Sequence, residues 1–285
     1  MNYNAQPQKW TAVITPKKPL LHIPIRELWK YRDLIVLSVR RDFIAVHKQT
    51  IMGPLWYFIQ PLISTVVFQI VFGNIAKIPT DDIPPFLFYM SGIVIWYYFS
   101  ACLSRTSGVF TSNAGLFTKV YFPRLAIPIA MVVSNAWQFL IQFLIFLGFY
   151  IFFVLKGAPI DFSYRVIIIP VLIVQTALLG LGTGLIVASL TTRFRDLQMA
   201  VAPAIQLWMY ASCIFYPRSS VPENLQWVMT LNPVVPIIES FRFAMMGRGQ
   251  VEIYQWLISL GVTAVVLLLG LVEFGRAEKT MADTV

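Results

Sequence analysis

Few side chains in this sequence have the type and spacing needed for acid–base or metal chemistry. The two histidines, His22 and His47, both precede the first long apolar run, where surface positions are expected. The adjacent acids Asp81 and Asp82 lie between prolines, which favours a simple turn. Both cysteines fall inside apolar runs and are interpreted as small buried side chains. We therefore predict neither a catalytic residue nor a metal site in this chain.

Phosphate binding through a glycine-rich loop is also not expected. The sequence contains no GxxxxGK[ST] motif. Gly180 and Gly184 lie four residues apart in a charge-free run. Small residues at this spacing let two membrane helices pack closely, so we interpret them as a packing face and not as a phosphate cradle.

The composition places the chain in a membrane. It is 58% hydrophobic and only 12% charged, whereas a soluble domain has about 25% charged residues. The net charge of +9 would suit either nucleic acid or an anionic membrane surface. Nine of the 22 Lys and Arg residues precede residue 49, next to the first apolar run, which is the pattern of a cytosolic membrane face. We predict contact with membrane lipids and no nucleic-acid partner.

Six charge-free runs are long enough to cross a bilayer, which takes about 20 apolar residues. An even number of spans places both termini on the same side. That side carries sixteen Lys and Arg residues outside the spans and the other side six, so the positive-inside rule places both termini in the cytosol. The sequence predicts an all-α integral membrane protein with six transmembrane helices, at residues 55–76, 85–104, 125–155, 166–192, 197–217 and 253–272.

The segment before the first span is predicted to be an amphipathic helix in the membrane interface. Residues 1–23 are expected to be a flexible cytosolic N-terminus. In residues 24–52, apolar side chains recur at helical spacing opposite a basic face. Gly53-Pro54 then makes a stiff entrance to the membrane domain, residues 53–285. An ordinary helix that packs on a soluble partner would show the same pattern.

A second region, residues 219–250, is too short and too broken to cross the membrane. Its uncharged part spans 15 residues and contains two prolines. We predict a re-entrant helical hairpin on the outer side, directly before the last span. Irregular backbone in a membrane is tolerated only beside protein or a water-filled cavity, so this hairpin suggests a gate or a pore lining. Glu239 and Arg242 are three residues apart, and we predict that they pair on one helix face and hold this outer gate.

Several segments, taken in order, resemble one family. They are KQTIMGPLWYFIQP at residues 48–61, LFTKVYFPRL at 116–125, TRFRDL at 192–197, and LNP followed by Arg242 at 231–242. Together they look like the membrane subunit of polysaccharide-exporting ABC transporters. The resemblance is greatest to O-antigen export permeases of the Wzm type, with teichoic acid and capsule export permeases as near relatives. It covers residues 26–283, and Met52 replaces a common Leu with little change in volume.

The resemblance implies a multi-pass permease of the bacterial inner membrane that is not an enzyme by itself. It would assemble from two copies of this chain and two copies of a separate ABC ATPase, which would bind ATP and Mg²⁺; no cofactor is implied in this chain. The implied substrate is polysaccharide linked to undecaprenyl pyrophosphate, moved from the cytosol to the periplasm. The cytosolic loops would couple to the ATPase through Phe117, Lys119, Tyr121, Phe122, Arg124, Arg193, Arg195 and Asp196.

The implied substrate presents a diphosphate at the inner leaflet. Arg40, Arg41 and Lys48, together with the turn at Gly53, are predicted to receive it, because cations form strong hydrogen bonds with phosphate oxygens. The alternative is that these cations only anchor the helix to anionic lipid.

The implied sugar chain needs a tolerant lining, and aromatic faces stack on sugar rings without selecting one hydroxyl pattern. Tyr89, Trp96 and Phe99 share one face of the second span with Gly92, which would leave room for the chain. Trp208 and Tyr210 lie inside the fifth span. We predict that these five aromatic residues line a channel; core packing and interfacial belts are the alternative.

Two kinds of alternative function are open: an ABC exporter of a different substrate, and a different class of membrane protein. For a different exporter, the substrate would be teichoic acid, capsule or another amphiphile. A secondary transporter is disfavoured because the predicted spans contain no Asp, Glu, Lys, Arg or His. From another class, an energy-independent channel or a membrane-bound transferase is the alternative, although a transferase needs carboxylates or a histidine poised in a cleft.

Overall fold

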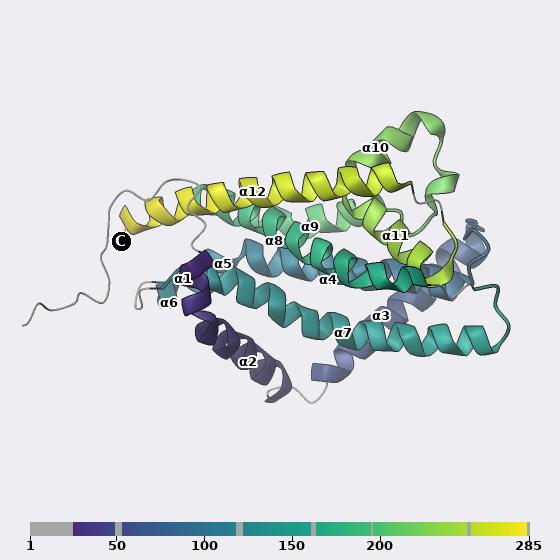
Figure 1. Cartoon of the computed structure of the whole chain (residues 1–285), viewed down its shortest axis with the longest axis horizontal. Coiled ribbons are helices and arrows are strands. Elements are labelled where there is room, and N and C mark those ends of the chain that lie inside the picture. The colour runs from purple at the N-terminus through teal and green to yellow at the C-terminus, as the bar shows by residue number, and fades with distance from the viewer. Residues whose placement is uncertain are drawn as a thin grey trace, which may run out of the picture.

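The described part of the chain is an elongated bundle of helices (Figure 1). The computed structural model describes residues 25–48, 53–117, 122–160, 164–194, 196–249 and 252–283. Within these ranges the regular elements are helices and no strand occurs, so the all-α prediction is confirmed. In chain order they are α1 (Ile25–Lys30), α2 (Arg32–Lys48), α3 (Gly53–Phe68), the π-helix η1 (Gln69–Ile75), α4 (Pro85–Ser107), α5 (Val109–Ser112), α6 (Ala114–Phe117), α7 (Ala126–Leu155), η2 (Tyr164–Ile168), α8 (Ile169–Arg193), α9 (Leu197–Tyr210), η3 (Arg218–Ser220), η4 (Glu223–Leu225), α10 (Gln226–Leu231), α11 (Val234–Met246) and α12 (Ile253–Asp283).

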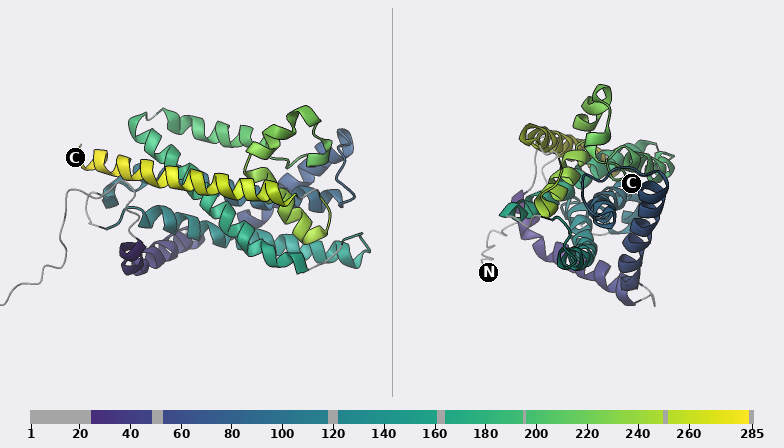
Figure 2. Two further views of the ribbon diagram at one scale, coloured as in Figure 1. Left: turned by 45° about the horizontal axis from the view of Figure 1, so that its top comes forward. Right: turned by 90° about the vertical axis from the view of Figure 1, so that its right-hand side faces the viewer.

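The bundle has two distinct ends. Helices α10 and α11 lie at one end, which we term the hairpin end, and α10 projects beyond the other helices there (Figures 1 and 2). Helices α1, α5 and α6 and the last turns of α12 lie at the opposite end, which we term the terminal end (Figure 1). The first and last described helices therefore lie at the same end of the bundle (Figure 1).

Five helical segments are long and apolar enough to cross a membrane among the residues described. They correspond to the first, second, third, fourth and sixth predicted spans, and they run over Leu55–Ile75, Pro85–Ser107, Ala126–Leu155, Tyr164–Arg193 and Ile253–Glu278. Their length follows from uninterrupted runs of apolar residues, whose backbone groups must be satisfied within the helix in a bilayer.

The fifth predicted span is not a continuous helix. Helix α9 contains 14 residues, which gives a length of about 21 Å against a hydrocarbon thickness of about 30 Å. It ends at Tyr210, and residues 211–217 continue as turns and bends in which Cys213 takes a left-handed φ of 52°. The prediction of a single helix over residues 197–217 is therefore wrong.

Helix α4 is the centre of the bundle. In its apolar stretch 78% of the residues are buried, whereas in the stretch formed by α3 and η1 only 11% of the residues are buried. Helix α8 packs closely on α4, because a Cβ added at Gly180 or at Gly184 would lie 2.6 Å from Cys102 Cβ or Thr106 Cβ. The interpretation of these two glycines as a packing face is confirmed.

The opposite face of α8 packs equally closely on α12. A Cβ added at Gly270 would lie 2.5 Å from the backbone oxygen of Gly182, and one added at Gly182 would lie 2.7 Å from the Cα of Leu267. Two backbones can approach this closely only where side chains are absent.

The segment before the first span is helical but consists of two helices. Helices α1 and α2 are separated by a turn at Tyr31, and α2 packs against α7, where the rings of Phe43 and Trp137 meet edge to face at 5.3 Å. Residues 1–24 and 49–52 lie outside the described residues. The interfacial location of this helix stays a prediction, as does the re-entrant path of the hairpin.

The predicted helical hairpin consists of α10 and α11, joined at Asn232-Pro233. Helix α11 ends at Gly247, whose left-handed φ of 67° closes the last turn. Every residue of α11 except Phe243 is buried. The second helix of the hairpin is thus a packed part of the bundle and not a surface loop.

Candidate functional site

Arg242 and Glu239 form a buried ion pair at the hairpin end. The two residues are 1% and 3% exposed, and Arg242 Nη1 lies 2.9 Å from Glu239 Oε1. Both project from α11, where residues three apart share one face. The predicted contact is therefore present, while its part in a gate stays a prediction.

Arg242 also donates hydrogen bonds to three backbone carbonyls. Nη1 donates to Cys213 at 2.9 Å, and Nη2 donates to Ile214 at 3.2 Å and to Phe88 at 3.3 Å. Its Nε donates to Ser91 Oγ at 3.3 Å. Since residues 211–217 have left the helical path, their carbonyls lack helical donors, and a buried carbonyl without a donor is costly. The guanidinium thus stabilises the break in the fifth predicted span.

Asn232 supplies the remaining contacts to this break. Its Nδ2 donates to the Ala211 carbonyl at 2.8 Å, and its Oδ1 accepts from Trp208 Nε1 at 3.0 Å and from the Val234 backbone at 3.1 Å. One side chain therefore holds the end of α9 and begins α11. We term Asn232, Glu239 and Arg242, with the carbonyls they bind, the hairpin-end cluster.

Gly92 lies directly against this cluster, and the space left by its missing side chain is occupied by Arg242 and Ile214. A Cβ at this position would lie 3.0 Å from Arg242 Nη2 and 3.2 Å from Ile214 Cγ2. The expectation that Gly92 leaves room for a substrate is wrong, because the room is filled by the guanidinium of Arg242.

The aromatic face of α4 is covered by the chain itself. Tyr89, Trp96 and Phe99 are all buried, with Trp96 5.4 Å from Phe99 and Phe99 5.1 Å from Trp208 between ring centroids. This is the packing alternative; a channel-lining role for these three stays a prediction that their burial in the single chain disfavours. Trp208 is half-buried, and Tyr210 is exposed and stacks on Phe215 at 5.2 Å.

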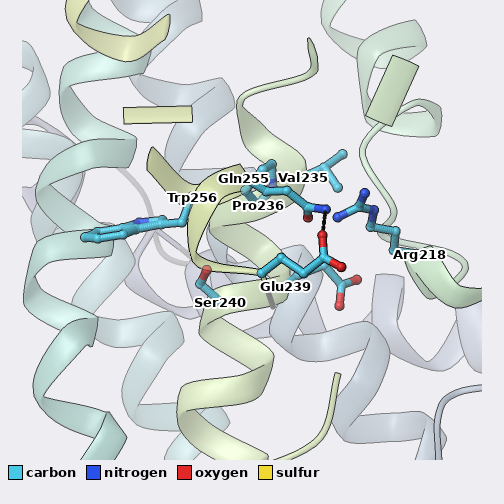
Figure 3. A pocket seen from close by; sticks show the side chains of 8 residues that line it. Arg218, Val235, Pro236, Glu239, Ser240, Gln255 and Trp256 are labelled. Carbon is cyan, nitrogen blue, oxygen red and sulfur yellow. Dashed lines mark hydrogen bonds between the residues drawn. The ribbon is translucent and has the colours of Figure 1, made fainter. Parts of the chain in front are cut away.

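A small cavity lies beside Glu239, between α11 and the start of α12 (Figure 3). Its volume is about 10 Å³, near the lower limit for one water molecule. Figure 3 shows Arg218, Ser240 and Gln255 around it. Because this space is so small, it is part of the packing of the hairpin and not a substrate pocket.

At the terminal end, the predicted diphosphate residues lie on the exposed side of α2. Arg40 and Arg41 are exposed and line an open hollow of about 450 Å³ with Leu37, Ile44 and Ala45. Gly53 is the first residue of α3, and the side chain of Lys48 lies outside the described residues. The hollow places two cations beside apolar side chains, an arrangement that suits an amphiphile.

Asp42 joins α2 to the centre of the bundle. Its Oδ2 lies 3.1 Å from Arg105 Nη2, at the end of α4, and its Oδ1 lies 3.0 Å from Arg41 Nη2. Arg105 Nη1 also donates to Asn135 Oδ1 of α7 at 3.0 Å. Sequence spacing does not reveal this contact, because its partners lie 63 residues apart.

The predicted ATPase-coupling residues divide into two groups. Phe117 is half-buried and Phe122 is buried at 6% exposure, so both side chains pack within the chain, while their part in ATPase coupling stays a prediction. Phe122 lies 5.9 Å from Phe117, within the same chain. Arg124 is half-buried, and Lys119 and Tyr121 lie outside the described residues.

The turn between α8 and α9 carries the second group. Arg193 and Asp196 are exposed, and Asp196 Oδ1 accepts a hydrogen bond from the Leu197 backbone at 3.1 Å, so it caps α9. Arg195 lies outside the described residues. Phe194 and Met199 were missed by the sequence analysis and are exposed, Met199 at 85%. Their position directly beside a charged turn was the available signal.

Within the described ranges, no group of three or more His, Cys, Asp or Glu side chains could hold a metal ion. The polar groups of the hairpin-end cluster bind each other and the backbone. Their arrangement holds an irregular segment inside a helix bundle, and it provides no nucleophile aligned with a base.

The amino-acid sequence of the chain is similar to one protein family and to several individual membrane proteins. The family model described as ABC-2 type transporter matches residues 33–246. The chain is 28% identical to an O-antigen export system permease protein of Myxococcus xanthus, over 86% of this chain and 92% of that protein. It is 26% identical to the corresponding protein of Klebsiella pneumoniae, over 88% and 94%. It is also 26% identical to a polysialic acid transport protein of Escherichia coli, over 81% and 88%.

Proposed function

The chain belongs to the ABC-2 type transporter family, and from this premise we propose that it is the permease subunit of an exporter of O-antigen or capsule-type polysaccharide. Relatives that carry such names align over 81–88% of this chain and over 88–94% of their own length. In this proposal a separate ATPase supplies the energy, which agrees with the absence of a nucleotide-binding loop from the sequence.

One structural observation supports an irregular crossing near the outer side of the proposed exporter. The fifth predicted span breaks after Tyr210. The backbone carbonyls just after the break accept hydrogen bonds from the side chains of Arg242 and Asn232. Non-helical backbone at membrane depth occurs where it is covered by protein or lines a water-filled cavity. In the proposed exporter, α9 and the broken segment form the fifth of six crossings, and α10 and α11 close the passage on the outer side.

The proposed assembly has two copies of the chain. Helices α3 and α9 both pack on α4. Only 11% of the residues in the apolar stretch of α3 and η1 are nevertheless buried, and in α9 only Val201 is buried. Helix α3 lies along one edge of the bundle in the end-on view of Figure 2. A second copy against these two helices would enclose a passage between the protomers, in which the half-buried Trp208 and exposed Tyr210 contact the sugar chain.

The proposed substrate is a polysaccharide on an undecaprenyl pyrophosphate carrier. Its diphosphate would meet Arg40 and Arg41 on α2, where the hollow combines cations with apolar side chains. The terminal end would face the cytosol of a bacterial cell, with both termini there, and the turn between α8 and α9 would meet the ATPase. Capsule or teichoic acid as the substrate would use the same geometry.

Reconstitution tests this proposal directly. The chain and its partner ATPase, placed together in liposomes, should move lipid-linked polysaccharide only when ATP is hydrolysed. Movement without ATP would identify an energy-independent channel, and formation of a new glycosidic or acyl bond would identify a transferase.

Replacement of Arg40 and Arg41 together by Gln should weaken binding of the pyrophosphate lipid while leaving binding of a plain anionic lipid nearly unaffected. Equal loss for both lipids would favour simple membrane anchoring.

A further inference from the structure

The last turns of α12 pack against the segment that precedes α7. Phe274 of α12 is buried and stacks on Phe110 of α5, with centroids 4.8 Å apart and an angle of 17° between the rings. Phe110 lies 5.9 Å from Phe117, and Phe117 lies 5.9 Å from Phe122. Four rings from distant parts of the chain thus form one continuous cluster at the terminal end.

Arg124 closes this cluster on the side of α12. Its Nη1 donates to the backbone carbonyl of Glu278 at 3.2 Å, and its Nε lies 3.9 Å from Glu278 Oε1. Its guanidinium also lies 5.8 Å from the centre of the Phe117 ring. The side chain is only 20% exposed, so its hydrogen-bonding groups are directed into the chain and away from an outside partner.

We propose that the end of α12, from Phe274 to Glu278, is the seat that fixes residues 122–124, where the chain enters α7, and that Arg124 is a positioning residue for ATPase coupling. This inference rests on the proposed function, because it assumes that residues 117–124 transmit the work of the ATPase. Arg124 acts through Glu278 and does not itself touch the ATPase.

Two different restraints make the seat specific. The contacts among the four rings keep Phe117 and Phe122 close to α12 but allow them to slide, because one aromatic face accepts a neighbour in several offsets. The planar guanidinium of Arg124 has fixed donor directions and binds the carbonyl and the carboxylate of the same residue. Without Arg124, the two rings stay packed while the path of the chain into α7 is no longer fixed.

The inference predicts uncoupling without loss of assembly. In the reconstituted complex, Arg124→Ala should leave ATPase binding and hydrolysis in place while polysaccharide exported per ATP falls by about fivefold or more, in the range of typical coupling energies. Arg124→Lys keeps the charge and one donor and should retain an intermediate ratio. A merely structural role would lower the amount of complex and leave the ratio unchanged.

Arg276 provides the matched control. It lies two residues from Glu278 on the same helix, is 55% exposed and pairs with Glu273 within α12. Arg276→Ala should keep the export-to-ATP ratio of the unmodified complex. An equal loss in the Arg276 variant, or an unchanged ratio in Arg124→Ala, overturns the inference.

A second measurement needs no ATPase and covers the case in which Arg124→Ala assembles poorly. Hydrogen exchange of the permease alone should become faster in residues 117–124 of the Arg124 variant and stay unchanged in the Arg276 variant. Unchanged exchange in both variants also overturns the inference. Failure of the unmodified complex to export would instead reject the proposed function, so the two failures are distinguishable.

Discussion

Both ends of the bundle carry arginine–carboxylate contacts, and the two ends use them differently. At the hairpin end, the side chains of Arg242 and Glu239 are 1% and 4% exposed. At the terminal end, those of Arg105 and Asp42 are 42% and 14% exposed. Arg242 also donates hydrogen bonds to three backbone carbonyls. The second partner of Arg105 is the side-chain amide oxygen of Asn135.

The difference determines what each end can do. A buried charge pair loses several kcal/mol when one partner is removed, because the other charge stays in an apolar surrounding. An exposed pair contributes less than about 1 kcal/mol, because water replaces either partner. The contact of Arg242 with Glu239 is therefore suited to holding one shape, and the contact of Arg105 with Asp42 is one that can break and form again at little cost.

The largest effect is expected for Arg242. Arg242→Met leaves Glu239 buried without its partner and removes the donors to Cys213 and Ile214, so it should destabilise the fold by about 3–5 kcal/mol. Thermal unfolding in detergent and the amount of protein in the membrane measure this. Exchanging the two charges should not rescue the variant, because the carbonyls still lack donors; full rescue would show that the pair alone matters.

Arg248 gives a contrast at the same end of the molecule. Its side chain is 41% exposed and its distance to Asp82 is 3.9 Å. Arg248→Met should therefore change the unfolding free energy by less than about 1 kcal/mol. If both arginine variants behaved alike, burial would not be what distinguishes the two regions.

Trp96 tests whether the interior next to the hairpin-end cluster is packing or passage. Trp96→Ala removes a buried ring and should cost about 3–5 kcal/mol, which lowers the amount of folded protein. Trp227, exposed on α10, is the matched control and should tolerate the same change. Normal protein amounts together with slow export by the Trp96 variant would contradict packing and assign Trp96 to the passage.

A smaller effect is expected from overfilling the space around Arg242. Gly92→Ala places a methyl group 3.0 Å from Nη2 and should cost about 1–3 kcal/mol. Gly148→Ala, at a helical glycine of α7 with open space around its Cβ position, is the control and should be neutral or slightly stabilising. Unfolding temperatures of the two variants would be compared; equal values would mean that the cluster adjusts freely.

The smallest effect is expected at the terminal end. Asp42→Asn weakens the contact with Arg105 and should change global stability by less than about 1 kcal/mol. It should nevertheless speed hydrogen exchange in α2, because this contact joins α2 to α4. Asp33→Asn, at a side chain that is 95% exposed, should leave exchange unchanged. A large loss of global stability from Asp42→Asn would remove the distinction between the two ends.

Much of the fold could be predicted because it depends on local patterns. Uninterrupted apolar runs predicted the five long helices, and the three-residue spacing predicted the contact of Glu239 with Arg242. The break after Tyr210 was not predicted, because the first proline, Pro217, comes only at the end of the broken segment. The side chain that binds its carbonyls, Arg242, lies some thirty positions further along the chain.

The candidate site was harder to predict because burial depends on distant partners. The periodic face of Tyr89, Trp96 and Phe99 looks the same whether it meets a passage or a neighbouring helix. Phe122 looks exposed from its loop, yet it belongs to a ring cluster that α12 completes from more than 150 residues away. A spacing rule reports which side chains share a face, and only the assembled bundle reports what covers it.

Helix α12 has the geometry of a lever. It is unbroken over 31 residues, a length of about 46 Å. Near its start Ser259 Oγ donates to the Pro233 carbonyl at the hairpin end, near its finish it holds Arg124, and the contact of Gly270 with Gly182 lies between them. With that contact as the fulcrum, the arm to Ser259 is about 16 Å and the arm to Glu278 about 12 Å. A shift at the terminal end would then be enlarged about 1.4-fold, and reversed in direction, at the hairpin end. Distances from spin labels on the two arms to fixed points on α4, measured with and without ATP, would change in opposite senses; changes in the same sense would show that α12 moves without a pivot.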